Sequence, residues 1–172
     1  HGIRHVPVTE DGALVNIVSE RDLFALQRLS LKQVSTQIRA ARDVDTLKLV
    51  AGQIRRFARN LLGQGVQARQ LTELISHLND VLVERLVQLV ADRHGLNLAH
   101  ACWLAFGSEG RSEQTVATDQ DNGLIFESAD PQTDRPRWLA MADDVNVALD
   151  QCGFPLCKGN VMARNPACCL TA

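Results

Sequence analysis

The sequence GSEGRSEQTVATDQDNGLIF, residues 107–126, is the part of the chain that decides the fold. A continuous apolar run, residues 101–106, precedes it, and its own last residues are apolar again. Short apolar runs bounded by glycine and polar residues are typical of buried strands. The stretch therefore predicts strands at 101–106 and 121–127, and residues 108–116 between them are long enough for about two helical turns.

Gly107 and Ser108 form a strand-to-helix turn that can bind an anion. Glycine lets the backbone approach a ligand closely, and the first residues of a helix present free backbone N–H groups. Plain connecting turns use the same two residues, so on its own this turn is a weak signal.

Two aspartates, Asp119 and Asp121, follow the turn, the first of them eleven residues after Ser108. Residues two apart in a strand project to the same side, so both carboxylates should face one point while Gln120 points away. Adjacent carboxylates repel one another unless a cation lies between them, and oxygen ligands at this spacing suit Mg²⁺. The spacing therefore brings an anion site and a metal site together.

Two helices are expected upstream of these residues. Apolar side chains recur at spacings of three and four from Val44 to Leu62, and after a glycine-rich turn a second stripe runs from about Gln67 to His94. Helices joined by such a short turn pack as an antiparallel pair. Downstream of the aspartates, residues 137–151 predict a further helix and residues 154–162 a third strand.

The N-terminal residues, 2–26, alternate apolar and polar side chains around a Glu-Asp-Gly turn at residues 10–12. This pattern predicts a strand, a turn and a strand, followed by a helix for which Ser19 is a plausible N-cap. Two strands and one helix cannot bury their own apolar faces. We therefore expect this piece to need a packing partner that the chain does not contain.

Charge is distributed unevenly, although the net charge is only −2. The segment from Arg28 to Arg69 contains nine Lys or Arg and two acids, and the rest of the chain is acidic. Phe57 is the single aromatic residue in that segment. A solvated face or a contact with acidic neighbours is therefore favoured over nucleic-acid binding.

The five cysteines form no CxxC pair and no Cys/His spacing typical of zinc, so we expect reduced thiols. The sequence has no apolar run of eighteen residues and no signal-peptide pattern, which argues for a cytoplasmic protein without a membrane span. The chain begins at His1 without an initiator Met, so we expect a processed chain or a fragment.

The stretch 107–126 resembles the nucleotidyltransferase superfamily that includes DNA polymerase β, in which a hydrophobic-Gly-Ser turn is followed by Asp-x-Asp on the next strand. More specifically, it is similar to the nucleotidyltransferase domain often found after CBS modules, which is related to the N-terminal part of protein-PII uridylyltransferases. The similarity extends to ISHLNDVLVERL upstream and CKGNVMARNP downstream, so it covers roughly Ser35 to the C-terminus.

The resemblance implies a role for each residue that matches the motif. Gly107 and Ser108 would bind the triphosphate of a nucleotide. Asp119 and Asp121 would be catalytic residues that bind Mg²⁺ and orient in-line attack on the α-phosphate, with pyrophosphate leaving.

Two basic residues are further candidates for nucleotide binding. Arg111 would pair either with a phosphate oxygen or, as a structural ion pair, with Glu113, and Lys158 would pair with a phosphate. One departure concerns the third carboxylate, which the superfamily carries on a later strand, because residues 163–172 contain no acid. We expect that carboxylate beyond Ala172, so that the chain stops before its active site is complete.

The N-terminal residues resemble the closing half of a CBS motif, in which a strand ending in IRHVPV leads through a turn and a second strand to a Ser-x-x-Asp step into a helix. In CBS modules these two residues, here Ser19 and Asp22, often meet the phosphate and ribose of an adenine nucleotide, and the modules usually pair, which implies a homodimer. Asn16 stands where the family usually has Gly. The alternative is that Ser19 caps the helix and Asp22 favours its dipole.

Together these patterns predict an α+β chain: the C-terminal part of a CBS domain over residues 1–28, a helical connector over 29–97 that belongs largely to the transferase region, and a truncated transferase core, a mixed sheet with flanking helices, over 98–172. The expected function is Mg²⁺-dependent transfer of a nucleoside monophosphate from a nucleoside triphosphate to an acceptor, such as a protein, in a signalling protein. The alternative is a non-catalytic sensor that binds nucleotide under CBS control.

Overall fold

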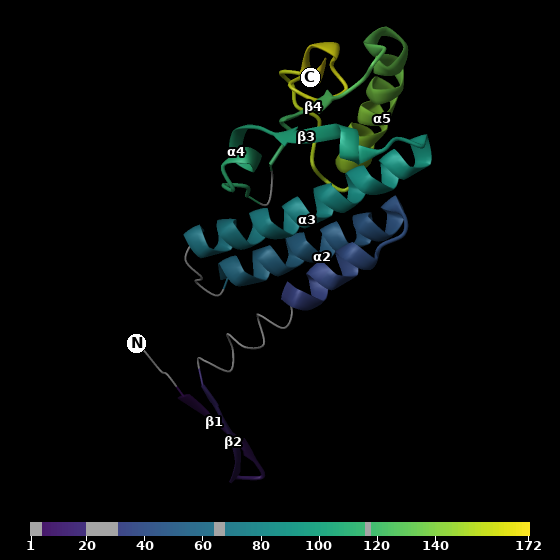
Figure 1. The fold of residues 1–172 in the computed structure, drawn as a ribbon. Coiled ribbons are helices and arrows are strands. Elements are labelled where there is room, and N and C mark those ends of the chain that lie inside the picture. Colours follow the sequence, from purple (N-terminus) through teal and green to yellow (C-terminus); the bar gives the residue numbers. More distant parts are fainter. Residues whose placement is uncertain (1–4, 20–30, 64–67, 116–117) are drawn as a thin grey trace.

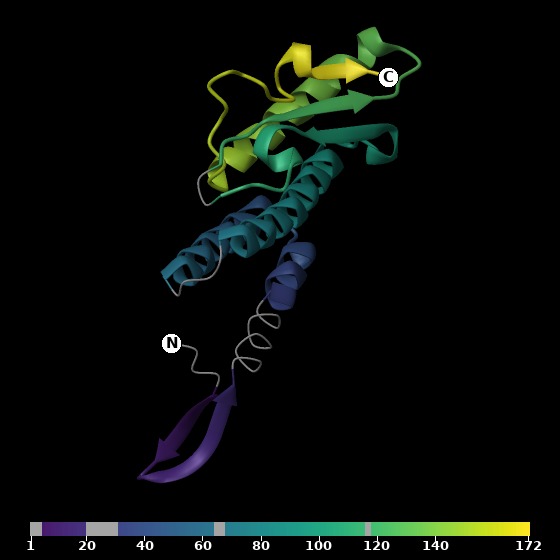
Figure 2. The same cartoon turned by 90° about the vertical axis from the view of Figure 1, so that its left-hand side faces the viewer.

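Two long helices, α2 (Val44–Gly63) and α3 (Ala68–His94), lie side by side in the α+β fold of the chain (Figure 1). The structure is a computed structural model that describes residues 5–19, 31–63, 68–115 and 118–172. Helix α3 lies between α2 and the part of the molecule that holds the main sheet and a third long helix, α5 (Pro131–Gln151), as Figures 1 and 2 show.

The predicted antiparallel pair of helices is confirmed. The buried residues of α2 recur at spacings of three and four, because one stripe of a helix faces its neighbour; they are Leu47, Val50, Ala51, Ile54, Ala58 and Leu61. Residues 31–40 are also helical, and their Ile38 is fully buried. Arg85 of α3 fixes the junction before α2, since its Nε and Nη2 donate to the Ala41 carbonyl at 2.9 and 2.7 Å.

The main sheet has three strands in the order β3-β4-β5, so β4 is central. β3 pairs with β4 in antiparallel fashion and β5 pairs with β4 in parallel fashion. Their bounds are β3 Ala101–Ala105, β4 Asn122–Phe126 and β5 Cys169–Thr171. Short 3-10 helices, η1 (Leu98–His100) and η2 (Pro166–Cys168), lead into β3 and β5.

Helix α5 supplies apolar cover for the sheet and also packs on α3. The ring of Phe126 in β4 stacks on Trp138 with 5.5 Å between the ring centroids. The helix begins at Pro131, earlier than the predicted residue 137, because Pro131 stands at its first turn and the Asp130 carboxylate accepts from the Thr133 N–H.

Three expectations for this half of the chain are wrong. Residues 154–162 form a loop, and the third strand is β5, farther along. The helix predicted over 108–116 is the single turn α4 (Gly107–Gly110), which is followed by Ser112 with a left-handed φ of 54°. Strand β3, expected to be buried, is partly exposed because it lies at the edge of the sheet.

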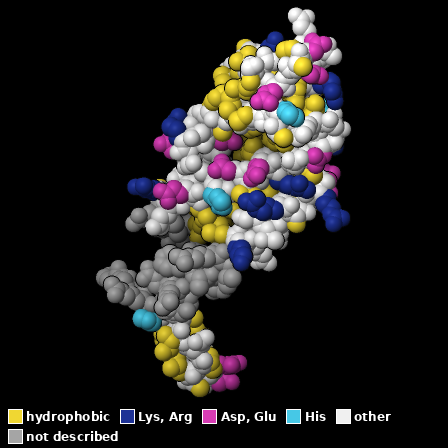
Figure 3. Space-filling model, viewed as in Figure 1, with side chains coloured by type: hydrophobic (Ala, Val, Ile, Leu, Met, Phe, Trp, Pro, Cys, Tyr) yellow, Lys and Arg dark blue, Asp and Glu magenta, His cyan; other side chains and the backbone are white. Residues whose placement is uncertain are grey.

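The N-terminal strands form the predicted hairpin, with β1 (His5–Glu10) antiparallel to β2 (Ala13–Ser19). Asp11 and Gly12 connect them with positive φ values of 50° and 81°, as a two-residue type I′ turn requires. The apolar side chains of the hairpin are exposed (Figure 3). The helix predicted to follow lies mostly outside the described residues.

All five cysteines are free thiols, as the sequence predicted. Burial raises the pKa of the Cys152 thiol to about 11, so this thiol is protonated at neutral pH. Within the described residues, no helix combines the length and the apolar character that crossing a bilayer requires.

Candidate active site

The Gly107 turn and Asp121 are in close contact. Because β3 and β4 are antiparallel, the last residue of β3, Ala105, pairs with Asn122 at the start of β4, and the Phe106 N–H donates to the Asp121 carbonyl at 2.8 Å. Gly107 has a left-handed φ of 55°, and a Cβ at this position would lie 2.5 Å from Asp121 Oδ2. Only glycine fits here, and its absent side chain leaves room for the carboxylate.

The aspartates alternate with a buried glutamine, as predicted from the sequence, although they precede β4 and do not lie within it. Asp119 is exposed and Asp121 is partly buried, whereas Gln120 is 2% exposed. The amide of Gln120 donates to the carbonyls of Asn146 and Phe154 at 2.9 and 2.8 Å. Gln120 is therefore an anchor that holds the aspartates on the outer side of the segment.

A buried amide network fixes this segment to α5. Asn146, which is fully buried, donates from Nδ2 to Gln120 Oε1 at 2.8 Å and to Asn122 Oδ1 at 2.9 Å. Its own Oδ1 accepts from the Arg164 N–H at 3.0 Å, and Asn122 Oδ1 also accepts from the Ala163 N–H at 2.9 Å. Asn122 Nδ2 has no partner among the described residues, but the oxygens of all three amides accept hydrogen bonds or join the network, which sets the position of Asp121 between its two neighbours.

The loop that follows α5 runs along the same segment. The Gln120 N–H donates to the Pro155 carbonyl at 3.0 Å, and the Asn122 N–H donates to the Val161 carbonyl at 3.1 Å. Lys158 lies between these two attachments, and its side chain is exposed. The structure thus places this candidate residue on a loop that borders the aspartates.

Glu109 and Asp80 are two acidic residues of the site that sequence reasoning did not identify. Burial, together with the negative charges of Asp80 and Asp121, raises the pKa of the Glu109 carboxyl to about 7. Burial also raises the pKa of Asp80, against the opposing effect of His77. Helix α4 thus contributes the carboxyl group of Glu109 near Asp121, and α3 contributes the carboxyl group of Asp80.

Arg111 forms the ion pair that was one of its two predicted roles. Its Nε lies 2.8 Å from Glu113 Oε2, and both side chains are largely exposed. The Gln114 N–H then donates to Ser76 Oγ at 3.0 Å, which attaches this loop to α3. The ion pair with Glu113 holds the Arg111 side chain at the surface. In the sequence, Arg111 follows closely after Gly107.

The predicted residues fall into two groups. The structure places Gly107 and Asp121 in direct contact, with Ser108 in the same turn and Asp119 two residues from Asp121. Ser19 ends strand β2, and Asp22 lies outside the described residues. Within the described ranges, no three His, Cys, Asp or Glu side chains are arranged to hold a metal ion together.

The missed residues left different signals in the sequence. Gln120 stands between two aspartates, where alternation already predicts an inward side chain. Asn146 interrupts the apolar face of α5 formed by Met141, Ala142, Val145 and Leu149, which is typical of a buried amide with a specific partner. The proximity of Asp80 on α3 to Glu109 left no signal in the sequence, because it depends on how the helix packs.

Comparison with known proteins gives one family match. Residues 52–172, which include most of α2 and all of α3, the sheet and α5, match the family described as "Putative nucleotidyltransferase DUF294". No curated protein and no solved structure matches the chain. With the match covering well over half of its length, the chain belongs to this nucleotidyltransferase family.

Proposed function

We propose that the chain carries the nucleotide site of a Mg²⁺-dependent nucleotidyltransferase, which transfers a nucleoside monophosphate from a nucleoside triphosphate to an acceptor. The observation that supports this most directly is the contact between Gly107 and Asp121. Backbone N–H groups at the start of α4 would bind the triphosphate, and Asp119 and Asp121 would lie beside them. This is the juxtaposition that phosphoryl-transfer chemistry requires.

The donor chemistry of the site fits a hard divalent cation. Its side chains are carboxylates, and the pKa of Glu109 is raised first by burial and then by the negative charges of Asp80 and Asp121, which a cation would neutralise. We assign Asp119 and Asp121 as the residues that would hold Mg²⁺. When bound, the ion would neutralise charge at the α-phosphate and favour in-line displacement of pyrophosphate.

The chain's own residues would bind and orient the substrate. Gly107 and Ser108 hold the triphosphate in this proposal, and Lys158, on the bordering loop, would pair with a phosphate oxygen. Arg111 is held at the surface by the pair of its Nε with Glu113, and its Nη groups would have to reach a phosphate oxygen from there. We infer a supporting role for Arg111 and a larger one for Lys158.

We further propose that residues 1–28 belong to a CBS module, residues 29–97 to a connector and residues 98–172 to the transferase core. In this arrangement, an adenine nucleotide at Ser19 and Asp22 would regulate transfer, the module would pair in a homodimer, and the acceptor would be a protein, as in protein-PII uridylyltransferases. The support is the resemblance of the N-terminal residues to a CBS motif and the hairpin that they form.

The test of the nucleotide site is binding by the double variant Asp119→Asn/Asp121→Asn. Titration with ATP, CTP, GTP and UTP, each with and without Mg²⁺, should show Mg²⁺-dependent binding that the double variant weakens by at least about tenfold. Asp150→Asn is the matched control, because Asp150 is an exposed acid on α5, and its affinity should not change. Undiminished binding by the double variant would contradict the proposed site.

A binding role without transfer is the second candidate function. It requires only the contact between the Gly107 turn and Asp121, and not the third carboxylate that the superfamily carries on a later strand. Incubation of the full-length protein with α-labelled nucleotides and cell extract separates the two functions. Label on any acceptor supports the enzyme, and tight nucleotide binding without label transfer supports the sensor.

A further inference from the structure

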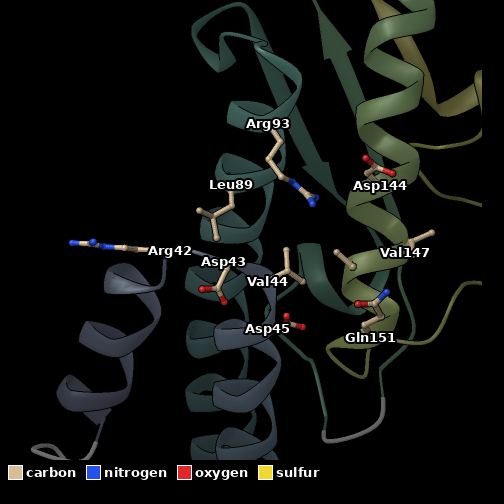
Figure 4. A pocket seen from close by; sticks show the side chains of 10 residues that line it. Arg42, Asp43, Val44, Asp45, Leu89, Arg93, Asp144, Val147 and Gln151 are labelled. Atoms are coloured by element: carbon tan, nitrogen blue, oxygen red, sulfur yellow. The ribbon is translucent and has the colours of Figure 1, made fainter.

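The C-terminal end of α5 lies beside α2. Gln151, the last residue of α5, lines a cavity of about 430 Å³ together with Val44 and Asp45 from the first turn of α2 (Figure 4). Farther along α2, the half-buried side chain of Arg55 reaches the residue that follows Gln151, because its Nη1 donates to the Cys152 carbonyl. A side chain of α2 is therefore attached to the point where α5 ends.

Cys152 is followed by a glycine turn that ends the helix. Gly153 has a left-handed φ of 91°, and its N–H and that of Phe154 donate to carbonyls in the last turns of α5 at 2.9 and 3.0 Å. These are the two hydrogen bonds of a Schellman motif, which satisfies carbonyls that a helix leaves free at its end. Arg55 satisfies a further one, the Cys152 carbonyl, with a positive charge that the helix dipole favours at this end.

Gly153 also makes room for Arg55. A Cβ at Gly153 would lie 2.7 Å from Arg55 Cζ, well inside the separation of about 3.5–4.0 Å that carbon atoms in contact keep. Glycine at this position therefore allows both the left-handed backbone and the close approach of the guanidinium. The guanidinium of Arg55 packs directly on the backbone of the turn.

The two residues that follow Gly153 hold the aspartate segment. The carbonyl of Phe154, which is 7% exposed, accepts from the side-chain amide of Gln120 at 2.8 Å, and the Pro155 carbonyl accepts from the Gln120 N–H at 3.0 Å. The two aspartates flank Gln120 in the sequence. The turn that Arg55 holds is thus continuous with the anchor of the aspartates.

Arg55 also lies next to the segment that leads into Asp119. It lines a cavity of about 20 Å³ together with Thr115 and Thr118. The Thr115 N–H donates to Thr118 Oγ1 at 2.9 Å, which holds these two residues together. Arg55 therefore borders the chain on both sides of the anchor at Gln120.

We propose that Arg55 is a positioning residue for Asp119 and Asp121. It holds the end of α5, and with it the two carbonyls that anchor Gln120, so that both carboxylates keep the spacing that a shared cation requires. Arg55 acts through Gln120 and not on the nucleotide. The inference rests on the proposed function for the role of the two aspartates, whereas the position of Gln120 is measurable without a nucleotide.

The first measurement is titration with ATP, CTP, GTP and UTP in the presence of Mg²⁺. Arg55→Ala should weaken the affinity for the nucleotide that the wild type binds best by about tenfold, because the charge-assisted hydrogen bond to the turn is lost. Arg55→Lys keeps a charged donor and should stay within about threefold of the wild type. Arg56→Ala, at an exposed position of α2, is the control for charge and should leave the affinity unchanged.

Leu61→Ala is the matched control for a general loss of stability. Leu61 is 5% exposed and belongs to a separate apolar cluster, so this variant is less stable but keeps Arg55 and its contact with Cys152. All affinities are measured at a temperature at which thermal melts show each variant to be folded. Under these conditions Leu61→Ala should bind nucleotide as the wild type does, which separates positioning from stability.

Hydrogen exchange followed by NMR is the second measurement. The Gln120 N–H should exchange about tenfold faster in Arg55→Ala, whereas the Glu127 N–H, which donates to the His100 carbonyl at the other end of β4, should not change. The inference is overturned if Arg55→Ala binds nucleotide as tightly as the wild type, or if the ratio of the two exchange rates is unchanged. A wild-type chain that binds no nucleotide contradicts the proposed function instead, and the exchange of Gln120 then decides whether Arg55 positions the segment.

Discussion

The strands of both sheets are rich in apolar residues, but the two sheets have different surroundings. Leu14 and Ile17 of the N-terminal hairpin are 59% and 52% exposed, whereas Leu124 and Phe126 of β4 are 1% and 0% exposed. The hairpin is closed by its turn and by its own strand pairing, while β4 lies between two other strands and under α5. The comparison teaches that an apolar pattern specifies a strand, and that burial requires a covering layer.

The second difference between the sheets is in their polar residues. Beside β4, the amides of Gln120, Asn122 and Asn146 are buried and bonded to one another. The hairpin has no such network in its described residues, and its Asn16 side chain accepts only from the next N–H along the chain. Side chains are therefore held in fixed positions at the main sheet. The following substitutions measure how much these contacts contribute to stability and to binding.

Asn146→Ala should have the largest effect on stability. It leaves Gln120 Oε1 and the Arg164 N–H without their partners in the core and also opens a cavity, so we expect a loss of about 3–5 kcal/mol in the free energy of unfolding. Urea denaturation followed by circular dichroism measures this loss. Asn60→Ala, at an exposed position of α2, is the control, and a similar loss in both variants would contradict the role of the network.

Glu109 should make stability depend on pH. Its pKa rises from the model-compound value of 4.5 to about 7 in the folded chain, so the folded state holds a proton that the unfolded state has lost. Stability should therefore fall by roughly 3 kcal/mol as the pH rises from about 4.5 through 7, and remain level above that.

Glu109→Gln removes the titrating group and should flatten this part of the pH profile. Denaturation in EDTA from pH 4 to pH 8 makes the comparison without divalent cations. The variant should equal the wild type near pH 4 and exceed it at pH 8. An unchanged slope between these values would show that the pKa of Glu109 is not raised in the folded chain.

Gly107→Ala tests the contact at the turn. The left-handed φ and the approach of Asp121 Oδ2 predict a loss of about 1–2 kcal/mol, because the methyl group is strained and also displaces the carboxylate. The free energy of nucleotide binding, measured by titration, should weaken by more than the free energy of unfolding does. Gly52→Ala is the control, since a Cβ there meets nothing within 4 Å and α2 favours alanine.

Ile17→Ser should have the smallest effect. Because Ile17 is 52% exposed, the change should alter the free energy of unfolding of the helices and main sheet by less than about 0.5 kcal/mol. Thermal melts followed at 222 nm, where the helices dominate the signal, measure it. A loss comparable to that of Asn146→Ala would mean that the two sheets fold as one unit.

Local sequence patterns predicted most elements of the fold. The long helices α2 and α3, the hairpin and strands β3 and β4 follow from apolar periodicity and from turn residues, which act within a few residues of one another. Strand β5 was missed because it is three residues long and because its partner, β4, is separated from it in the sequence by α5. The length of α4 was missed because Ser112, rather than glycine, takes the left-handed conformation after it.

The proximity of the Gly107 turn to Asp121 was predicted from the motif, whereas the residues around them were not. The spacing of Gly107 and Asp121 was enough to expect them near each other, since both lie next to strands of one sheet. The raised pKa of Glu109 and the bonds of Asn146 depend on which faces of α3 and α5 meet the sheet. Such contacts between distant segments have no local signal in one sequence.

The parallel pairing of β4 with β5 also bears on how the chain folds. These strands are separated by α5, so their register, Leu124 opposite Cys169, closes only after a long segment is in place, whereas the α2–α3 pair forms across a short turn. Contacts that are distant in sequence form slowly, so pulse-labelled hydrogen exchange should show protection in α2 and α3 before β4. We therefore expect a newly synthesised chain to acquire its helical pair first and the contact between Gly107 and Asp121 last.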